Sequence, residues 1–471
     1  MADSNSEPGK DRQQQQRRPP EERIEDFREV VRGFSEEQAQ QEAERCLECS
    51  DPLCVEGCPV RIDIPAFIKK IKEGDFREAG EKIREDNLLP AVCGRVCPQE
   101  DQCEEVCVLK NAGEPVAIGA LERFAADHLP RETIHEAIPE TGKHKVAVIG
   151  SGPAGLTAAA DLRRFGHEVT VFEAFHEPGG VLVYGIPEFR LPKDIVAKEV
   201  EYLRNMGVEF ILNTFVGRTV TIDDLLGDRG FDAVFIGSGA GTPRFLGIPG
   251  ENLPGIYAAN EFLSRINLMK AYRSDYQTPV KIGDKVAVIG GGNVALDAAR
   301  SARRLGNNPR VELVYRRNRE QMPARAEEIE HAEEEGINFN FLANPVRFLA
   351  AEDDVVRAVE CQEIELGEPD SSGRPRPVAK PGTEFEIEAD TVVVAIGSRP
   401  RELLAETTEG LETTEWGTLK VNRNTSETSR EDIFAAGDIV TGSATVIEAM
   451  GGARRAAESI DEYLRDKIGR E

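Results

Sequence analysis

The sequence predicts an α/β protein with two helix-covered parallel sheets, preceded by a small all-helical domain. A strand, a glycine-rich turn and a helix occur twice with nearly the same residues, starting at Lys145 and again at Lys285. Two later apolar segments, residues 231–244 and 390–400, end in glycine-rich turns, as late strands of parallel sheets do. Eight of the nine cysteines precede both units. Chance is a poor explanation for such an internal duplication.

The composition indicates a folded protein with a strongly acidic surface. The 471 residues are enough for two to four domains with separate cores. The formal net charge of -27, from 85 acids and 58 bases, argues against binding to nucleic acid phosphates. Hydrophobic residues make up 40% of the chain, which favours folding over disorder. We interpret the acidity as adaptation to a salty cytoplasm, where a Debye length of about 3 Å at about 1 M salt screens self-repulsion.

The sequence also predicts a cytoplasmic protein. No apolar run approaches the roughly 20 residues that span a bilayer. Residues 1–20 lack the apolar centre of a signal peptide. In a reducing compartment, clustered cysteines are more often metal ligands than disulfides.

The N-terminal part predicts a helical domain at residues 23–140, after a polar, Gln-rich tail at residues 1–22 that we expect to be disordered. Residues 24–45 predict short helices. From Ile64 to Ile83, apolar residues recur at helical spacing with a break at Gly74. These helices separate two cysteine groups, which the domain is expected to bring together.

The first repeated unit, KVAVIGSGPAG, matches the turn by which Rossmann-type folds bind dinucleotides. Gly150 permits the tight turn, Gly152 lets the backbone approach a pyrophosphate, and Gly155 allows close packing of the helix. The helix N-terminus supplies N–H donors. Glu173 ends the next strand, where a carboxylate accepts hydrogen bonds from ribose hydroxyls. The predicted site also includes Pro153 and Ala154.

The second unit, KVAVIGGGNVA, predicts a second nucleotide site at Gly290, Gly292, Asn293 and Val294. The position that corresponds to Glu173 is Arg316, followed by Arg317. Guanidinium groups can bind a 2'-phosphate bidentately, so this site is predicted to prefer NADP over NAD. The alternative is an ordinary solvated basic pair.

The C-terminal part predicts a strand, a turn at Gly437 and Asp438, and a long helix from Thr445. An Asp in a turn is by default a cap. In a chain with two nucleotide folds, Asp438 also fits a hydrogen-bonding partner of a flavin. The FAD-binding fold is then discontinuous, residues 141–255 and 430–471, with the NADP(H)-binding fold inserted at 256–429. Within the insert, residues 353–388 indicate a hairpin or loop excursion.

The cysteines form two groups, C-x2-C-x4-C-x3-C from Cys46 to Cys58 and C-x3-C-x5-C-x3-C from Cys93 to Cys107. A structural zinc would need four of them in tetrahedral array. Disulfides are disfavoured by the compartment. FAD and NADP(H) handle electrons in pairs, and iron–sulfur clusters give those electrons a one-electron exit. Cys58-Pro59 and Cys97-Pro98 are similar to the endings of cluster-binding runs, so we predict two [4Fe-4S] clusters.

From about Ile24 to Leu464 the chain resembles the small (beta) subunit of glutamate synthase. It is also similar to the NADP(H)-binding subunit of NADH-dependent ferredoxin:NADP oxidoreductase and to the N-terminal half of dihydropyrimidine dehydrogenase. The resemblance lies in both cysteine groups and in the segments VAVIGSGPAGL, EPGGVLVYGIPEFRLPK, IGGGNVALD, YRRNREQMPAR and AAGDIVTGSATVIEAMGGAR.

The resemblance implies how the cysteines are shared between the clusters. One cluster would be held by Cys46, Cys49, Cys54 and Cys107. The other would be held by Cys58, Cys97, Cys103 and, where dihydropyrimidine dehydrogenase has Gln, by Glu122. Cys93 would not be a ligand, and Cys361 would be a buried or incidental thiol. The alternative for Glu122 is a solvated position on a helix.

The resemblance further implies that residues 178–193 lie along the flavin, with Gly179, Gly180 and Val181 against its rings. Asp297 is expected to be a solvated acid. The implied reaction passes hydride from NADPH to FAD, then single electrons through the clusters to a large subunit that makes glutamate from glutamine and 2-oxoglutarate. No catalytic acid or base is assigned, because the cofactors carry the chemistry.

Two alternatives to this function remain. One is an oxidoreductase on the same scaffold that exchanges electrons with ferredoxin or sulfide. The other is a passive electron-relay subunit. The expected partner is a glutamate synthase-type large subunit or another redox protein in a hetero-oligomer, without nucleic acid or membrane.

Overall fold

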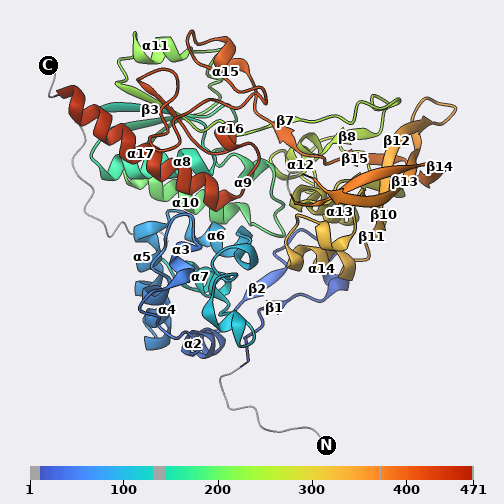
Figure 1. Ribbon diagram of the computed structural model, residues 1–471, viewed down its shortest axis with the longest axis horizontal. Helices are drawn as coiled ribbons and strands as arrows, with labels where there is room; N and C mark the ends of the chain where they lie inside the picture. The colour runs from blue at the N-terminus through green and yellow to red at the C-terminus, as the bar shows by residue number, and fades with distance from the viewer. Residues whose placement is uncertain (1–10, 131–143, 371–372, 469–471) are drawn as a thin grey trace, which may run out of the picture.

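The computed structural model describes residues 11–130, 144–370 and 373–468. Figure 1 shows a helical body of N-terminal residues beside two bodies that each contain a parallel sheet. This arrangement confirms the predicted fold class. Among the described residues, no helix has both the length and the apolar character needed to span a bilayer.

The N-terminal body is helical, as predicted. Its long helices are α4 and α5, which Gly74 separates with a left-handed φ of 86°. Phe67, Ile71 and Ile83 are fully buried between the helices. The helices are α2 (Glu36–Glu44), α3 (Leu53–Glu56), α4 (Ile64–Glu73), α5 (Phe76–Asp86), α6 (Pro90–Val96) and α7 (Ile118–Asp127), with the 3-10 turns η1 (Gln99–Asp101) and η2 (Val108–Asn111).

The prediction of a disordered tail is wrong for residues 11–22; residues 1–10 lie outside the described residues. Strand β1 (Gln16–Arg17) pairs antiparallel with β2 (Val31–Gly33), and α1 (Pro20–Arg23) follows β1. Arg12 pairs with Glu104 at 2.7 Å, and Arg17 pairs with Glu327 at 3.1 Å. The composition of this segment did not predict its ordered structure, because the acidic partners of these arginines lie far away in the sequence.

The first parallel sheet has the order β17-β6-β3-β4-β5. Strand β17 comes from the C-terminal part of the chain and pairs with β6, which confirms the discontinuous fold. Helix α17 packs along α8 on one face (Figure 1). The elements are β3 (Lys145–Ile149), α8 (Pro153–Arg164), β4 (Glu168–Phe172), α9 (Val181–Tyr184), α10 (Lys193–Asn205), β5 (Glu209–Ile211), α11 (Ile222–Leu226), β6 (Ala233–Ile236), β17 (Ile433–Ala435), α16 (Asp438–Thr441) and α17 (Val446–Ile468).

The second parallel sheet has the order β11-β10-β9-β15-β8, and all its pairings are parallel. The predicted excursion at residues 353–388 is a long hairpin in a separate antiparallel sheet. The elements are β8 (Ile256–Ala258), α12 (Ala259–Asn267), β9 (Lys285–Ile289), α13 (Asn293–Arg304), β10 (Arg310–Tyr315), η3 (Arg319–Gln321), α14 (Ala326–Glu334), β11 (Asn338–Phe341), β12 (Ala343–Ala350), β13 (Val356–Pro369), β14 (Pro375–Glu388) and β15 (Thr391–Val394).

The chain returns to the first fold earlier than the predicted boundary at residue 430. Strand β7 (Thr242–Pro243) pairs with β16 (Ser398–Arg399), and α15 (Leu403–Glu406) follows. Leu404, Leu411 and Leu419 then pack in the core of the first fold. The predicted boundary was too late because this return segment carries no regular apolar pattern.

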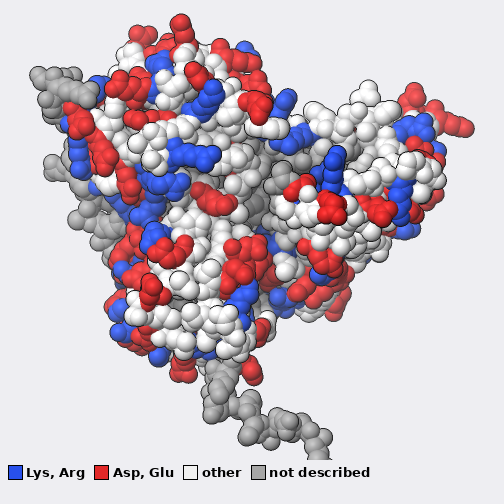
Figure 2. All heavy atoms as spheres, viewed as in Figure 1, with Lys and Arg blue, Asp and Glu red and all other residues white. Residues whose placement is uncertain are grey.

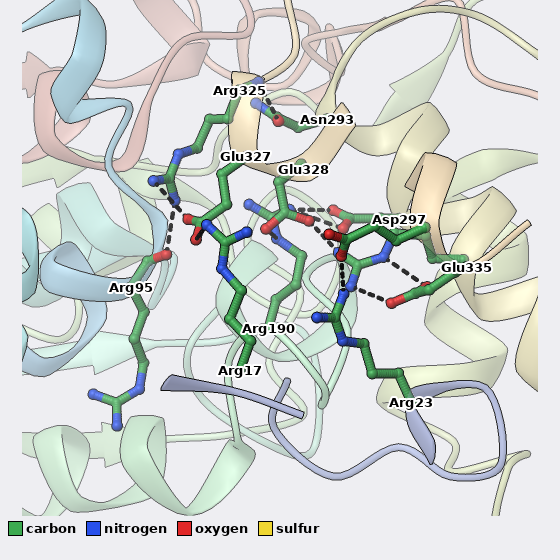
Figure 3. Close-up of polar contacts among 12 residues, drawn as sticks. Arg17, Arg23, Arg95, Arg190, Asn293, Asp297, Arg325, Glu327, Glu328 and Glu335 are labelled. Atoms are coloured by element: carbon green, nitrogen blue, oxygen red, sulfur yellow. Dashed lines mark hydrogen bonds and ion pairs between the residues drawn. The ribbon is translucent and has the colours of Figure 1, made fainter. Parts of the chain in front are cut away.

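A buried ionic network joins the two nucleotide-type folds (Figure 3). Arg190, from the loop after α9, makes two hydrogen bonds of 2.8 Å to Asp297 on α13. Arg300 is fully buried and contacts Glu328 and Glu335, the latter at 2.8 Å. Asp297 is therefore buried and paired, which corrects the expectation of a solvated acid. Its partner lies 107 residues away in the sequence.

We expect Arg300→Leu to destabilise the second fold by about 3–5 kcal/mol, because Glu328 and Glu335 each lose one of the two buried arginines that pair with them, and a hydrogen bond to a charged group is worth about 1.5–3 kcal/mol. Native-state hydrogen exchange of the β9 and β15 amides measures this loss. The control is Arg347→Leu, whose pair with Glu360 is half exposed, and which should cost less than about 1 kcal/mol. Equal exchange in the two variants would contradict a stabilising role for the network.

Candidate nucleotide and cysteine sites

The first glycine-rich turn has the geometry that its sequence predicts. Gly150 adopts a φ of 96°, and a Cβ on Gly155 would lie 1.9 Å from the Gly150 carbonyl oxygen. A Cβ on Gly152 would meet no atom within 4 Å, so the start of α8 is open to a ligand. A Cβ on Gly180 would lie 2.7 Å from Gly152 Cα. Only glycine therefore allows the two loops to approach so closely.

Glu173 is held at the end of β4 by the glycine-rich turn. Its Oε2 accepts a hydrogen bond of 3.0 Å from the Ser151 backbone N–H and another from the Ser151 hydroxyl. Its Oε1 accepts one of 2.9 Å from the Phe175 N–H. Gly179 N–H in turn donates to Ser151 Oγ at 2.9 Å. Ser151, which sequence reasoning missed, thus joins all three parts of the site.

The turn at Gly437 and Asp438 faces this same site. Gly437 has a φ of 77°, and a Cβ there would lie 3.0 Å from Ala154 Cβ. Burial raises the pKa of Asp438 to about 6, while the Ala444 N–H donates to its carboxylate at 3.2 Å. Burial, with the negative charges of Asp438 and Glu173, raises the pKa of Tyr184 to about 12. Tyr184 therefore lies near both predicted carboxylates, although its sequence position gave no signal.

Thr445 caps α17 rather than pointing to an open site. Its backbone N–H donates to Glu448 Oε2 at 2.9 Å, and its Oγ1 accepts from the Glu448 N–H at 3.3 Å. This reciprocal pair is a capping box. A contribution of Thr445 to a ligand is thus limited to its place at the helix N-terminus. Val181 is partly exposed at the start of α9.

Helix α17 packs on the Gly437 turn through Ala449 and, further along, on the cysteine domain. Met450 Sδ lies 3.6 Å from Cys93 Sγ. A Cβ on Gly451 would lie 2.6 Å from the Pro59 carbonyl oxygen, so the helix packs closely on the Cys58-Pro59 segment. Arg454 donates to the Val60 carbonyl at 3.1 Å. One helix thus links the first nucleotide site to the cysteines.

The second glycine-rich turn repeats the first. Gly290 adopts a φ of 144°, and a Cβ there would lie 2.3 Å from the Ala395 carbonyl oxygen. Gly292 caps α13, and Val294 in its first turn is half exposed. The Asn293 side chain is less available to a ligand, because its oxygen accepts a hydrogen bond of 3.1 Å from the Arg325 backbone N–H.

The two predicted phosphate-binding arginines differ in their exposure to solvent. Arg316 is exposed, whereas Arg317 is buried. Arg317 donates to Asp370 and to the Pro375 carbonyl, both at 2.8 Å, and so holds the turn of the β13–β14 hairpin. Sequence reasoning missed this role because Asp370 follows 53 residues later.

Four predicted ligand cysteines, from both groups, line one largely apolar cavity, here called the outer cysteine site. Burial, with the nearby Cys46 and Cys107, raises the pKa of Cys54 to about 12. These four thiols fit the donor set of one [4Fe-4S] cluster. They are Cys46, Cys49, Cys54 and Cys107.

The inner cysteine site contains the buried thiols Cys58, Cys97 and Cys103. Burial raises the pKa of Cys58 to about 11, and the charge of Glu122 adds to this shift. Glu122 is itself buried, which raises its pKa to about 8. The alternative of a solvated Glu122 is therefore wrong. Three thiolates and one carboxylate fit a second cluster.

Cys93 lies beside this inner site. A hydrogen bond to Cys93, followed by burial, raises the pKa of Cys97 well above its usual value. Asn87, which sequence reasoning missed, donates to Glu122 at 2.7 Å and lies 3.7 Å from the Cys93 sulfur. Cys361, by contrast, is buried in the core of the second fold. No three His, Cys, Asp or Glu side chains of the described residues converge on a single-ion site.

Arg325 connects the second glycine-rich turn to the inner cysteine site (Figure 3). Besides its backbone bond to Asn293, its guanidinium donates to the Arg95 carbonyl at 3.0 Å and to Gln99 Oε1 at 3.2 Å. Gln99 donates to the Cys93 carbonyl at 3.1 Å. These groups border a polar cavity of about 520 Å³ between the cysteine domain and the second fold.

Comparison with known families separates the chain into two parts. Residues 23–134 match the family described as "Dihydroprymidine dehydrogenase domain II, 4Fe-4S cluster". Residues 144–456 match the family described as "Pyridine nucleotide-disulphide oxidoreductase". The boundary between them agrees with the junction of the helical body and the first sheet.

Among curated proteins, the chain is similar to the NADP(+)-dependent formate dehydrogenase subunit beta of Moorella thermoacetica. The two are 42% identical over 88% of this chain, which spans 60% of that relative. It is 39% identical to the glutamate synthase [NADPH] small chain of Escherichia coli (strain K12), over 93% of this chain and 94% of the relative. The small chain of Azospirillum brasilense is 38% identical over 96% of this chain and 94% of its own length.

Solved structures share the fold of the two sheets. Mycobacterium tuberculosis FprA in complex with NADPH is 22% identical, covers 70% of this chain and 86% of its own, and gives a TM-score of 0.58.

We expect Arg317→Ala to speed amide exchange about 10- to 100-fold at the ends of β13 and β14 nearest their turn. The reason is the loss of charged hydrogen bonds, worth about 1.5–3 kcal/mol, to Asp370 and Pro375. Hydrogen exchange with mass spectrometry measures this change. Arg316→Ala is the matched control and should leave the hairpin unchanged; an equal effect of both variants would refute the distinction.

Proposed function

This chain belongs to the pyridine nucleotide-disulphide oxidoreductase family, to the branch that includes the glutamate synthase small chains and the related formate dehydrogenase subunit beta, and from that premise we propose how it oxidises NADPH. In the proposed function, FAD takes hydride from NADPH, and electrons leave singly through two [4Fe-4S] clusters. When bound, the flavin converts two-electron into one-electron chemistry and the clusters carry single electrons. The protein binds and orients these groups.

The first glycine-rich turn is the proposed FAD site. Glu173 is positioned by Ser151 to accept hydrogen bonds from a ribose, and the start of α8 is open to a pyrophosphate. Gly179 and Gly180 bring the backbone against the same turn. Asp438 and Tyr184 add polar groups that converge on one side of the site. This convergence supports residues 144–255 and the C-terminal segment as one FAD-binding unit.

The second turn is the proposed NADPH site. Gly290 and Gly292 shape the approach to the N-terminus of α13, which offers N–H donors to a pyrophosphate. The exposed Arg316 is the proposed partner of the 2'-phosphate. Arg317 acts indirectly, by fixing the hairpin next to it.

One observation carries the proposed electron route: helix α17 packs both on the Gly437 turn, through Ala449, and on Cys93 and the Cys58-Pro59 segment. The buried inner site is therefore the first receiver of electrons from the flavin. The outer site is partly exposed and is the proposed exit. A passive relay is disfavoured, because it would have no use for two intact nucleotide turns.

The identity of the electron acceptor is a separate part of the proposal. The relatives named as small chains favour a glutamate synthase-type large subunit. A second candidate acceptor is a partner subunit in another NADP-linked complex. The similarity to a formate dehydrogenase subunit beta favours it. Ferredoxin or sulfide as acceptor is a third possibility on the same scaffold. Co-purification with a large glutaminase-containing chain would select the first candidate.

Anaerobic assay of the cofactor-loaded protein tests the reaction. NADPH should reduce ferricyanide, and the preparation should contain flavin and about eight irons, as two [4Fe-4S] clusters require. A sample with neither flavin nor iron would overturn the proposal. A fully loaded sample that does not oxidise NADPH would instead support the passive relay.

We expect Arg316→Ala to lower kcat/KM for NADPH about 10- to 100-fold, because a charged hydrogen bond to the 2'-phosphate is worth about 1.5–3 kcal/mol. The value for NADH, which lacks this phosphate, should change little. Steady-state kinetics with both nucleotides measure the ratio. An unchanged NADPH to NADH preference would exclude Arg316 as the phosphate ligand.

We expect Glu122→Ala to alter the signal of one cluster and leave the other intact, because a ligand change alters a cluster's potential. Electron paramagnetic resonance and iron analysis measure both. The matched variant Cys93→Ala removes the neighbouring thiol and should keep both signals. The reverse result, with Cys93→Ala alone losing iron, would make Cys93 the fourth ligand.

A further inference from the structure

Exposed apolar side chains surround the outer cysteine site. Four side chains, here called the exit patch, are Leu47, Leu53, Val106 and Val108, with exposed fractions of 62%, 48%, 37% and 37%. Leu47 and Leu53 adjoin Cys46 and Cys54, and the two valines flank Cys107. All four line the same cavity as the four thiols. They lie at the proposed exit of electrons.

Packing among the described residues does not account for this exposure. Ile64 and Ile68, which line the inner wall of the same cavity, are almost fully buried and supply its apolar surroundings. Leaving large apolar groups in water forgoes about 25 cal/mol for each Å² that could be buried. Contiguous exposed apolar groups mark interaction sites on soluble proteins.

The charges around the patch are acidic. In residues 44–56 and 100–110 the exposed charged side chains are six acids and one base: Glu44, Glu48, Asp51, Glu56, Asp101, Glu105 and Lys110. Lys72 and Arg61 reach in from outside these segments to pair with Glu48 and Glu56. The rim therefore keeps a net negative charge. Figure 2 shows acidic side chains bordering uncharged surface on the helical domain.

This charge selects among possible occupants. A second copy of this chain would bring an identical acidic rim and a formal charge of -27 against the patch. Like charges across an interface disfavour such a pairing. A partner with a basic rim is attracted, and its apolar centre can cover the four exposed side chains.

We propose that the exit patch is the docking surface for an electron-accepting protein whose redox-bearing face is apolar at its centre and basic at its rim. The proposal rests on the proposed function, in which electrons leave from the outer cysteine site. Docking over the patch excludes water and brings the partner's redox centre close to the exit. Salt weakens the contribution of the rim but not that of the apolar centre.

The test compares two acceptors with NADPH and the anaerobic, cofactor-loaded protein. A basic c-type cytochrome probes docking, and ferricyanide, a small anion, needs no docking surface. The variant Leu47→Ser with Leu53→Ser should lower kcat/KM for the cytochrome about tenfold or more, since it removes two central apolar contacts. Ferricyanide turnover and iron content are measured on the same samples, and cytochrome reduction is expressed relative to ferricyanide reduction, so that a change in cluster content is not counted as lost docking.

The matched control is Phe245→Ser with Trp416→Ser, which alters two apolar side chains of 67% and 70% exposure outside the patch. Cytochrome reduction should not change in this control. Asp51→Lys with Asp101→Lys tests the rim: it should slow cytochrome reduction at low salt, with the difference vanishing near about 1 M salt.

The outcomes separate the two proposals. Unchanged cytochrome reduction in the Leu47 and Leu53 variant would overturn the docking surface while the proposed function stands. Ferricyanide reduction without any cytochrome reduction by the unaltered protein would overturn it as well. Failure with both acceptors would instead overturn the proposed function.

Discussion

A buried ion pair, Arg190 with Asp297, lies at the centre of the contact between the two nucleotide folds. Arg190 comes from the loop after α9, and Asp297 lies one turn into the helix that opens from the second glycine-rich turn. Both side chains are buried. If one of them is removed, water cannot solvate the charge of the other. Arg300 and Glu335 extend the same network toward the helix face of the second fold. Groups that belong to neither nucleotide site thus help to hold the two sites in their relative positions.

The cysteine domain is attached to the nucleotide folds by three sets of contacts. Helix α17 packs closely on it through Gly451, which has no side chain to hold the segments apart. Arg325 adds a polar connection from the second glycine-rich turn to the carbonyl of Arg95. The ordered N-terminal strand contributes the third contact, an ion pair between Arg17 and Glu327. The inner cysteine site therefore contacts both nucleotide folds, whereas the outer site faces solvent.

The sequence predicted what depends on local pattern. Glycine spacing, strand periodicity and the repeated unit were sufficient for both sheets and the discontinuous first fold, whereas the sharing of the cysteines between two sites came from the resemblance to known families. The sequence alone could not reveal ion pairs whose two residues lie far apart in the chain. Arg317 with Asp370, Arg190 with Asp297 and the order of residues 11–22 all depend on such pairs. Ser151, Asn87 and Tyr184 were missed for the same reason, since each gains its role only from neighbours that folding brings together.

The discontinuous first sheet affects the order in which the protein can be built on the ribosome. Strand β6 is made early, but its neighbour β17 begins at Ile433, after the whole inserted fold has been synthesised. The edge of β6 stays unpaired during this interval and is open to wrong pairing with other nascent chains. Helix α17 follows β17 in the chain and covers Cys93 and the Cys58 segment. The inner thiols therefore stay uncovered by this helix until the inserted fold and β17 have been synthesised.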